Sequence, residues 1–213
     1  MMKKLVIFDL DGTLLDTAKS LQECMNYALE KNGFKKITLS QTRAYVGNGS
    51  LLFALRACKD EQKAEDVHND FLSVYKNYPS SKVKPFANVK KLLKTLNEKG
   101  VKLAVFSNKP HFATQILCDD IFKNNTFDYV LGHKEGAPLK PDKQGVIEIL
   151  SKLNVDAQDA ILIGDGETDA LTANNAGVDF IGALWGFRTK DQLQSNGAKC
   201  FADTPKDLIN FII

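Results

Sequence analysis

Short apolar runs alternate with longer amphipathic segments along most of this chain. Each run is four to six residues long and is bounded by glycine or polar residues, which is typical of a strand buried in a parallel sheet. Between the later runs, apolar residues recur three and four positions apart, the spacing of a helix that packs one face on a sheet. The pattern predicts an α/β fold with a five-stranded parallel sheet, its strands at Leu5–Phe8, Val101–Phe106, Tyr129–Gly132, Ala160–Gly164 and Phe180–Ala183.

Residues 17–83 carry helical periodicity and no strand pattern. Thr17 is the expected cap of a helix whose apolar residues lie at 21, 24, 25, 28 and 29, and Gly33 lies near the end of this helix. Further helices are expected at Ser40–Tyr45, Ser50–Cys58 and Glu61–Tyr78. An all-helical insertion of this length predicts two domains, an α/β core of residues 1–16 and 84–213 and a helical cap of residues 17–83 over the strand ends.

The helices of the core have start and stop signals. The helix Asn88–Lys99 ends at Gly100, and Pro110 stands where another helix can begin. Pro141 suits the first position of a helix that runs to about Leu153. Thr204 is the expected N-cap of a final helix, with Pro205 as its first residue.

Composition and charge place the chain among ordinary soluble globular proteins. Its 213 residues suffice for one sizeable core and a smaller module. Hydrophobic residues make up 44% of the chain and charged residues 25%, which are common values for globular domains. The formal net charge is +2 and the basic residues are scattered, so we expect no nucleic-acid partner.

The length of the apolar runs and the spacing of the cysteines indicate the cellular compartment. No apolar run approaches the length of a membrane span, and Asp9 interrupts the first run, which argues against a signal peptide. The four cysteines show no C-x-x-C spacing and no metal-ligand grouping with the three histidines, so free thiols in a reducing cytosol are expected. The sequence therefore predicts a cytoplasmic protein with no membrane partner.

Carboxylates follow the first predicted strand directly. Asp9 and Asp11 lie two positions apart at its carboxyl end, the edge where parallel sheets gather their chemistry. Two carboxylates this close repel each other unless a cation or a proton lies between them. An isolated Asp-Gly pair is usually only a turn, but this pair belongs to a longer pattern.

Residues 9–16 read D-L-D-G-T-L-L-D, which resembles the D-x-D-G-T-L-x-D nucleophile motif of the haloacid dehalogenase superfamily, whose members are mostly phosphatases. The resemblance implies that Asp9 is the nucleophile and forms an aspartyl-phosphate, and that Asp11 is the general acid and base. Gly12 and Thr13 would belong to the phosphate-binding loop. The resemblance covers essentially the whole chain and implies a Rossmann-like core with the helical cap placed directly after this first motif.

Two further strand ends carry residues suited to phosphate. Ser107 and Asn108 precede a helix start, where a hydroxyl and backbone amides can bind phosphate oxygens, although Ser-Asn is by itself more often a helix cap. The superfamily has its second, phosphate-binding motif at this place. Its third motif is a lysine, typically followed by proline, and the resemblance assigns this role to Lys140, both in catalysis and in phosphate binding.

The fourth strand end adds two more aspartates. Asp165 follows the strand directly, and Asp169 lies four residues later in the first turn of a helix, where an acidic residue also interacts favourably with the helix dipole. Clustered aspartates suit a hard cation such as Mg²⁺. We expect Asp9 and Asp165 to bind Mg²⁺ by side chain and, as the resemblance implies, Asp11 to bind it by its backbone carbonyl, with Asp169 supporting these ligands.

The cap contains a short glycine signal. Gly47, Asn48 and Gly49 precede a predicted helix, and their N–H groups could bind an anionic substrate group, although a plain turn between helices explains the sequence equally well. Phosphoglycolate-phosphatase-like members of the superfamily carry a similar glycine pair here, and a W-G-[FY] motif like residues 185–187. The roles of Arg43, Arg56 and Glu167 stay open.

Together these features predict a Mg²⁺-dependent phosphomonoester hydrolase for a small phosphorylated metabolite, with phosphoglycolate as one candidate. A hydrolytic dehalogenase would need neither Asp11 nor Asp165. A β-phosphoglucomutase-like phosphoryl mutase shares all the core motifs and stays an alternative, as does a phosphoacceptor or binding module in which Asp9 is a regulatory phosphosite. A monomer or a homodimer is expected.

Overall fold

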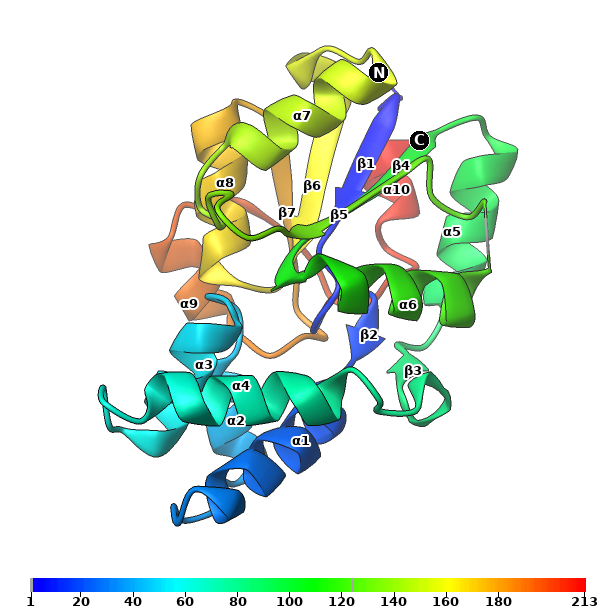
Figure 1. The fold of residues 1–213 in the computed structure, drawn as a ribbon. Coiled ribbons are helices and arrows are strands. Elements are labelled where there is room, and N and C mark those ends of the chain that lie inside the picture. The colour runs from blue at the N-terminus through cyan, green and yellow to red at the C-terminus, as the bar shows by residue number, and fades with distance from the viewer. Residues whose placement is uncertain (1, 124) are drawn as a thin grey trace.

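The computed structural model describes residues 2–123 and 125–213 and has a central parallel sheet (Figure 1). The strand order is β5-β4-β1-β6-β7-β8, and every neighbouring pair is parallel. The α/β fold class is as predicted, but the sheet has six strands instead of five. The missed strand, β8, is a three-residue edge strand, too short to show a hydrophobic period. The strands are β1 (Leu5–Phe8), β4 (Lys102–Pro110), β5 (Tyr129–His133), β6 (Ala160–Gly164), β7 (Asp179–Ala183) and β8 (Cys200–Ala202).

Helices cover both faces of the sheet because neighbouring residues of each strand point to opposite faces. Val6 and Phe8 of β1 join a cluster with α5 (Val89–Glu98), α6 (His111–Phe122) and α10 (Ile209–Ile212). Leu5 and Ile7 join the opposite cluster, with α7 (Gln144–Leu153) and α8 (Glu167–Ala176), while α9 (Lys190–Ser195) packs beside α8. Each face of the sheet therefore has its own hydrophobic cluster.

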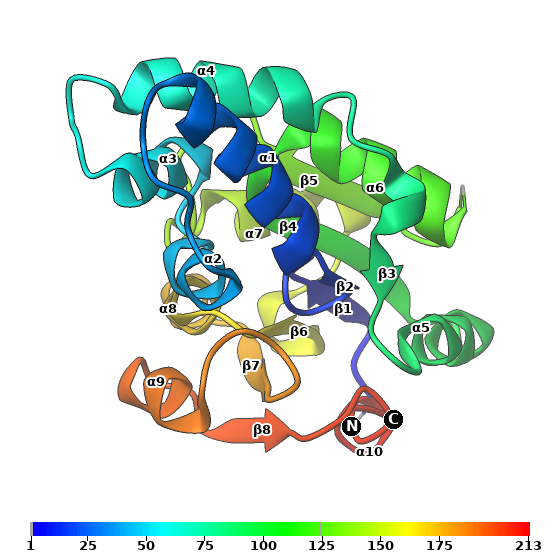
Figure 2. The same ribbon diagram turned by 90° about the horizontal axis from the view of Figure 1, so that it is seen from below.

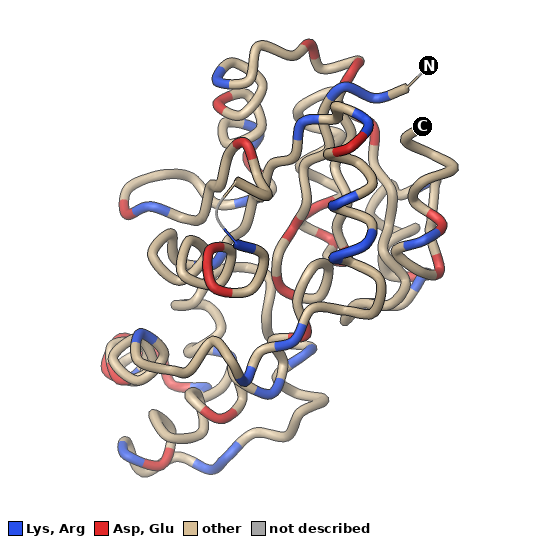
Figure 3. The backbone as a smooth tube through the Cα atoms, turned by 90° about the vertical axis from the view of Figure 1, so that its right-hand side faces the viewer, with Lys and Arg blue, Asp and Glu red and all other residues tan. Residues whose placement is uncertain are grey.

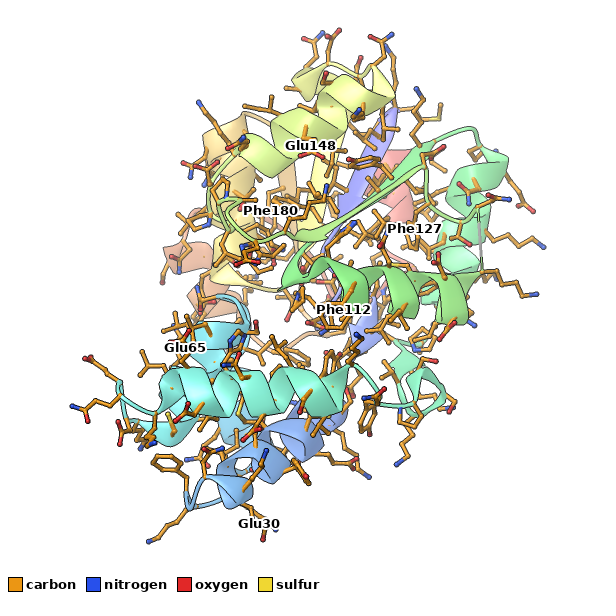
Figure 4. All side chains as sticks on the ribbon, viewed as in Figure 1. Glu30, Glu65, Phe112, Phe127, Glu148 and Phe180 are labelled. Atoms are coloured by element: carbon orange, nitrogen blue, oxygen red, sulfur yellow. The ribbon has the colours of Figure 1, made fainter. Side chains whose placement is uncertain are left out.

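Aromatic packing extends the first of these clusters. Phe127, labelled in Figure 4, lies just before β5 and meets Phe122 of α6 edge to face, with ring centroids 5.5 Å apart. Such edge-to-face pairs are favoured because the positive ring edge meets the negative ring face. The pair ties the end of α6 to the start of β5.

Two predicted helix starts in the core are wrong. The helix α7 begins at Gln144, not at Pro141, because Asp142 accepts the Gln144 N–H at 2.7 Å and closes a turn before the helix. The final helix begins at Ile209, not at Thr204-Pro205, because Thr204 caps a turn through the Asp207 carboxylate. In both places a short polar side chain satisfies backbone groups outside a helix.

A bundle of four helices lies at the carboxyl ends of the strands. Figure 2 shows the molecule from below, the side on which this bundle lies. These helices share a separate hydrophobic cluster. The chain enters the bundle through β2 (Leu15–Asp16) and leaves it through β3 (Lys84–Pro85), which pair antiparallel. The domain boundaries at 16/17 and 83/84 stay a prediction, and residues 17–83 are called the cap below. Its helices are α1 (Ala18–Lys31), α2 (Leu39–Tyr45), α3 (Ser50–Cys58) and α4 (Ala64–Tyr75), and short 3₁₀ turns occur at Ser80–Lys82 and Ala157–Asp159.

Charges of both signs are spread along the chain. Figure 3 shows basic and acidic residues interspersed along the backbone of both the cap and the core. Among the described residues, none of the helices is long and apolar enough to cross a bilayer.

Candidate active site

Four strand ends meet beneath the cap. Asp9 follows β1, Ser107 and Asn108 lie in the last part of β4, Lys140 lies in the loop after β5, and Asp165 follows β6. All five side chains are buried and line one cavity between the sheet edge and the cap. The parallel topology explains this gathering, because parallel strands present their carboxyl ends at the same edge.

Lys140 connects two of the acidic residues. Its Nζ lies 2.7 Å from Asp9 Oδ1 and 2.6 Å from Asp169 Oδ1, and it donates to the Phe106 carbonyl at 3.0 Å. Burial alone would lower the pKa of Lys140, but the carboxylates of Asp169 and Asp9 outweigh burial and raise it. The ammonium therefore keeps its charge and holds Asp9 in place.

Asp165 is held by two segments far apart in the sequence. Its Oδ1 accepts the Thr13 hydroxyl at 2.9 Å, and its Oδ2 accepts the Phe187 N–H at 2.7 Å. Gly12 has a φ of +89°, and a Cβ there would lie 2.3 Å from Asp165 Oδ2, while a Cβ at Gly186 would lie 2.2 Å from Asp165 Cβ. Both positions therefore require glycine. The close approach of Gly186 and the Phe187 N–H give the W-G-F motif a physical role, because both hold the Asp165 side chain in position.

Asp9, Asp165 and Asp169 form an acidic group able to hold a cation. One oxygen from each lies within 4.8 Å of the others. Without a cation, burial raises the pKa of Asp9 to about 7 against the opposing charge of Lys140, and burial together with the Asp9 charge raises the pKa of Asp165 well above its usual range. An all-oxygen donor set with this electrostatic cost fits Mg²⁺.

Asp169 has a larger part in this acidic group than the sequence indicates. It was expected to support the metal ligands, and it does contact Lys140 and accept the Gly166 N–H at 2.9 Å. One of its oxygens also belongs to the acidic group itself. The ligand set of Asp9, Asp165 and the Asp11 carbonyl stays a prediction.

Asp11 has a partner that the sequence did not reveal. Lys109 Nζ lies 2.6 Å and 2.9 Å from the two Asp11 carboxylate oxygens, and the Lys109 side chain is almost completely buried. Lys109 comes directly after the predicted motif residues Ser107 and Asn108, so its position next to the motif was the one available signal. The expected acid and base is therefore held by a buried ion pair.

The core also reaches into the cap. Asn108 Nδ2 donates to the Gly47 carbonyl at 2.9 Å and to the Lys140 carbonyl at 3.0 Å, while Lys140 N–H donates to Asn108 Oδ1. Asn48 accepts from Arg56 at 2.9 Å, so both its loop and Arg56 are held within the cap. Gly47 and Gly49 line the cavity and have φ values of +119° and +93°.

Comparison with known proteins agrees with this geometry. A sequence model of the haloacid dehalogenase-like hydrolases matches residues 6–183. The chain belongs to this family. The phosphoglycolate phosphatase of Psychrobacter arcticus is 32% identical over 214 residues, 94% of this chain and 92% of that protein. The phosphoglycolate phosphatase of Xanthomonas campestris pv. campestris is 31% identical over 188 residues, 87% of this chain and 85% of that protein.

A solved structure shows the same likeness. It is the crystal structure of a protein from Lactobacillus delbrueckii subsp. bulgaricus, provisionally named a phosphoglycolate phosphatase. The TM-score is 0.93 at 33% identity, with 100% of this chain and 99% of that chain covered. These findings confirm the predicted superfamily, fold class and enzyme class, which is a phosphatase.

Arg188 is a second residue of this haloacid dehalogenase-like hydrolase that sequence reasoning missed. It follows the W-G-F motif in the core, and Nε bonds both Glu167 oxygens at 3.0 Å. Its Nη2 donates to the Val46 carbonyl at 2.7 Å and its Nη1 to the Arg43 carbonyl, both at the end of α2. Glu167 thus orients a contact between core and cap, and the Arg43 side chain takes no part in it.

Proposed function

We propose that this protein is a Mg²⁺-dependent phosphomonoester hydrolase that works through an aspartyl-phosphate on Asp9. The observation that carries the proposal is the buried group in which Lys140 joins Asp9 to Asp169 beside Asp165. These charges line a cavity between the sheet edge and the cap, where a cap can exclude water during the reaction. Clustered buried carboxylates cost stability unless a cation offsets them, so their arrangement favours a chemical role.

The residues divide the reaction into two steps. The Asp9 carboxylate attacks phosphorus while the ester oxygen leaves, and Asp11 gives that oxygen a proton. A water molecule then attacks the aspartyl-phosphate, Asp11 takes its proton, and phosphate and free Asp9 result. Lys140 orients Asp9, while Ser107, Gly12 and Thr13 would bind the phosphoryl oxygens. When bound by Asp9, Asp165 and the Asp11 carbonyl, Mg²⁺ would offset the negative charge of carboxylates and phosphate.

We propose phosphoglycolate as the first substrate to test. The relatives that carry its name match 94% and 87% of the chain, and cap residues line the cavity opposite the strand ends. Gly47, Asn48 and Gly49 precede α3, where N–H groups can bind a substrate oxygen. This loop lines the same cavity as Asp9 and is our proposed contact to the organic part of the ester.

Three measurements test this function. We expect the protein to release phosphate from p-nitrophenyl phosphate and from phosphoglycolate in Mg²⁺, and Asp9→Asn to release none, because an amide cannot form the acyl-phosphate. Chelation by EDTA should abolish turnover, and added Mg²⁺ should restore it. Undiminished activity in excess EDTA contradicts the metal assignment.

A phosphate-release assay also separates the phosphatase from the alternative phosphoryl mutase. Transfer of the phosphoryl group to a sugar phosphate without release of phosphate would show a mutase.

A further inference from the structure

Two buried side-chain oxygens have no hydrogen-bond partner in the described part of the chain. They are Thr17 Oγ1 and the Tyr75 hydroxyl. Buried polar atoms nearly always have a partner, so each exception needs an explanation. Thr17 stands before α1 and does not line the cavity, whereas Tyr75 does line it. Tyr75 therefore lines the active-site cavity and carries a buried hydroxyl without a hydrogen-bond partner.

Apolar side chains make up much of the cap wall around Tyr75. Tyr75 stacks on Phe71 with ring centroids 5.3 Å apart, and Phe71 meets Phe53 edge to face at 5.8 Å. Leu21 and Val46 also line the cavity from the cap. A hydroxyl left without a partner in such a wall costs stability. The cost is offset if a ligand group takes the hydrogen bond.

Other polar groups of the wall are already engaged. The Ser50 hydroxyl lies 2.8 Å from His68 Nε2 and is bonded within the cap. The Asn108 amide bonds backbone groups of residues 47 and 140. On the cap side of the cavity, the Tyr75 hydroxyl is therefore the buried side-chain group left for a substrate, among the residues that the structure describes.

The protonation state of Tyr75 indicates what kind of group would bind. Lys109 Nζ lies 4.9 Å from the centre of the Tyr75 ring, and this buried ammonium is paired with the Asp11 carboxylate. Burial raises the pKa of Tyr75, so its hydroxyl keeps its proton and can donate. A neutral hydroxyl without a partner suits an oxygen acceptor, and its hydrogen bond is strongest when that oxygen is anionic.

We infer that Tyr75 is a specificity-determining residue whose hydroxyl donates to a carboxylate oxygen on the organic part of the substrate. The substrate class is a small phosphomonoester with a carboxylate close to the ester carbon. The inference rests on the proposed phosphatase function and adds the residue that selects the substrate. The aromatic wall packs on the carbon atoms of such a substrate, and Tyr75 binds its polar end.

The test compares two esters of the same shape. Phosphoglycolate carries a carboxylate where isobutyl phosphate carries two methyl groups. We expect the wild type to prefer phosphoglycolate in kcat/KM, and Tyr75→Phe to lower the ratio of the two values roughly tenfold, because one hydrogen bond to a charged group is lost. The matched control is Tyr78→Phe, which removes a cap hydroxyl that donates to Glu23 at 2.8 Å outside the cavity and should leave the ratio unchanged.

A binding measurement separates this inference from the proposed function. In the Asp9→Asn variant with Mg²⁺, calorimetry should show roughly tenfold weaker phosphoglycolate binding after Tyr75→Phe is added. Unchanged binding, or equal losses on both esters, would show that the hydroxyl contacts only water, and the inference would be wrong while hydrolysis stood. A wild type that hydrolyses no phosphomonoester overturns the proposed function, and the binding comparison still decides the role of Tyr75.

Discussion

Asp11 and Lys109 show how one buried pair can control a catalytic carboxylate. Lys109 Nζ bonds both oxygens of Asp11, and neither side chain is freely exposed to water. Removing one partner of a buried ion pair leaves the other charge without compensation, at a typical cost of about 3–5 kcal/mol. Any substitution at Asp11 therefore affects both the reaction and the stability of the fold.

For Asp11→Asn we expect loss of activity that depends on the leaving group. Alkyl phosphates need a protonated leaving oxygen and should lose roughly 10²–10⁴-fold in kcat/KM, while p-nitrophenyl phosphate should lose much less. Thermal unfolding should show a lower Tm because Lys109 loses its counterion. The turnover of wild type and Asp11→Asn is compared at a temperature well below that lower Tm, so that both proteins are folded. Equal losses on alkyl and aryl esters would remove Asp11 from the acid role.

The acidic group should make the metal-free protein sensitive to pH. Burial raises the pKa of Asp9 to about 7 and that of Asp165 well above its usual range, so the folded state binds more protons than the unfolded state. The stability that these protonated carboxyls contribute is fully present below the pKa of about 4 that they have in the unfolded chain. It is lost as the pH rises through about 7, the pKa of Asp9 in the folded protein. In EDTA, the Tm should fall between pH 5 and pH 8 through this contribution.

Two comparisons check the origin of this pH dependence. Asp9→Asn removes one of the two titrating carboxyls and should give a shallower fall in Tm than the wild type. Mg²⁺ should raise the Tm most at the upper end of the range, where the carboxylates are ionised and bind it best. Parallel curves for wild type and Asp9→Asn would show that other groups control the effect.

At the scale of elements, the start of α3 links the cap to the loop that carries Lys140. A Cβ at Gly49 would lie 3.0 Å from Leu139 Cδ1, next to Lys140, and the φ of +93° is unfavourable for other residues. Asn108 bonds both loops, through the Gly47 carbonyl before α3 and through the Lys140 carbonyl. The position of the loop before α3 therefore depends on the glycine at position 49 and on the core residue Asn108.

Gly49→Val should lower kcat/KM for phosphoglycolate more than for isobutyl phosphate or for a nucleotide. The branched side chain displaces the loop whose N–H groups we propose as a substrate contact, at a cost above the ~1 kcal/mol of a general disturbance. Gly33→Val is the control, because Gly33 also has a positive φ, +78°, but meets no atom within 4 Å. A uniform loss across the three esters would limit the loop to a structural role.

At the scale of the whole molecule, Arg188 joins the two layers of the structure. Its guanidinium is buried, is paired with Glu167 in the core and donates to carbonyls at the end of α2 in the cap. Positive charge at a helix C-terminus is favourable, and the planar guanidinium reaches several acceptors at once. The position of the cap over the cavity depends on this contact and on the Asn108 contact to Gly47.

Arg188→Met should loosen the cap without changing the groups that react. We expect a higher KM, a roughly tenfold lower kcat/KM and a larger radius of gyration in solution scattering, because charged hydrogen bonds between cap and core are lost. Arg43→Met is the control, since it removes an exposed arginine but keeps the backbone carbonyl that Arg188 contacts. An unchanged KM with an unchanged radius would show that other contacts hold the cap.

The sequence by itself determined the parts of the site that follow from local pattern and parallel topology. Apolar runs of strand length placed Asp9, Ser107 and Asp165 at strand ends, and parallel strands necessarily bring those ends to one edge. The helical periodicity of residues 17–83 likewise predicted an all-helical insertion. Local signals worked here because each depends on residues close together in the chain.

Only the tertiary structure decided the contacts between distant segments. Lys109 meets Asp11 across 98 positions, and Arg188 meets the Arg43 carbonyl across 145. Tyr75 lines the cavity with a hydroxyl that has no hydrogen-bond partner. The starts of α7 and α10 depended on single turn-forming side chains, and β8 exists through its pairing with β7. Such features depend on how packed elements approach one another, and hydrophobic period carries no information about which side chains then meet.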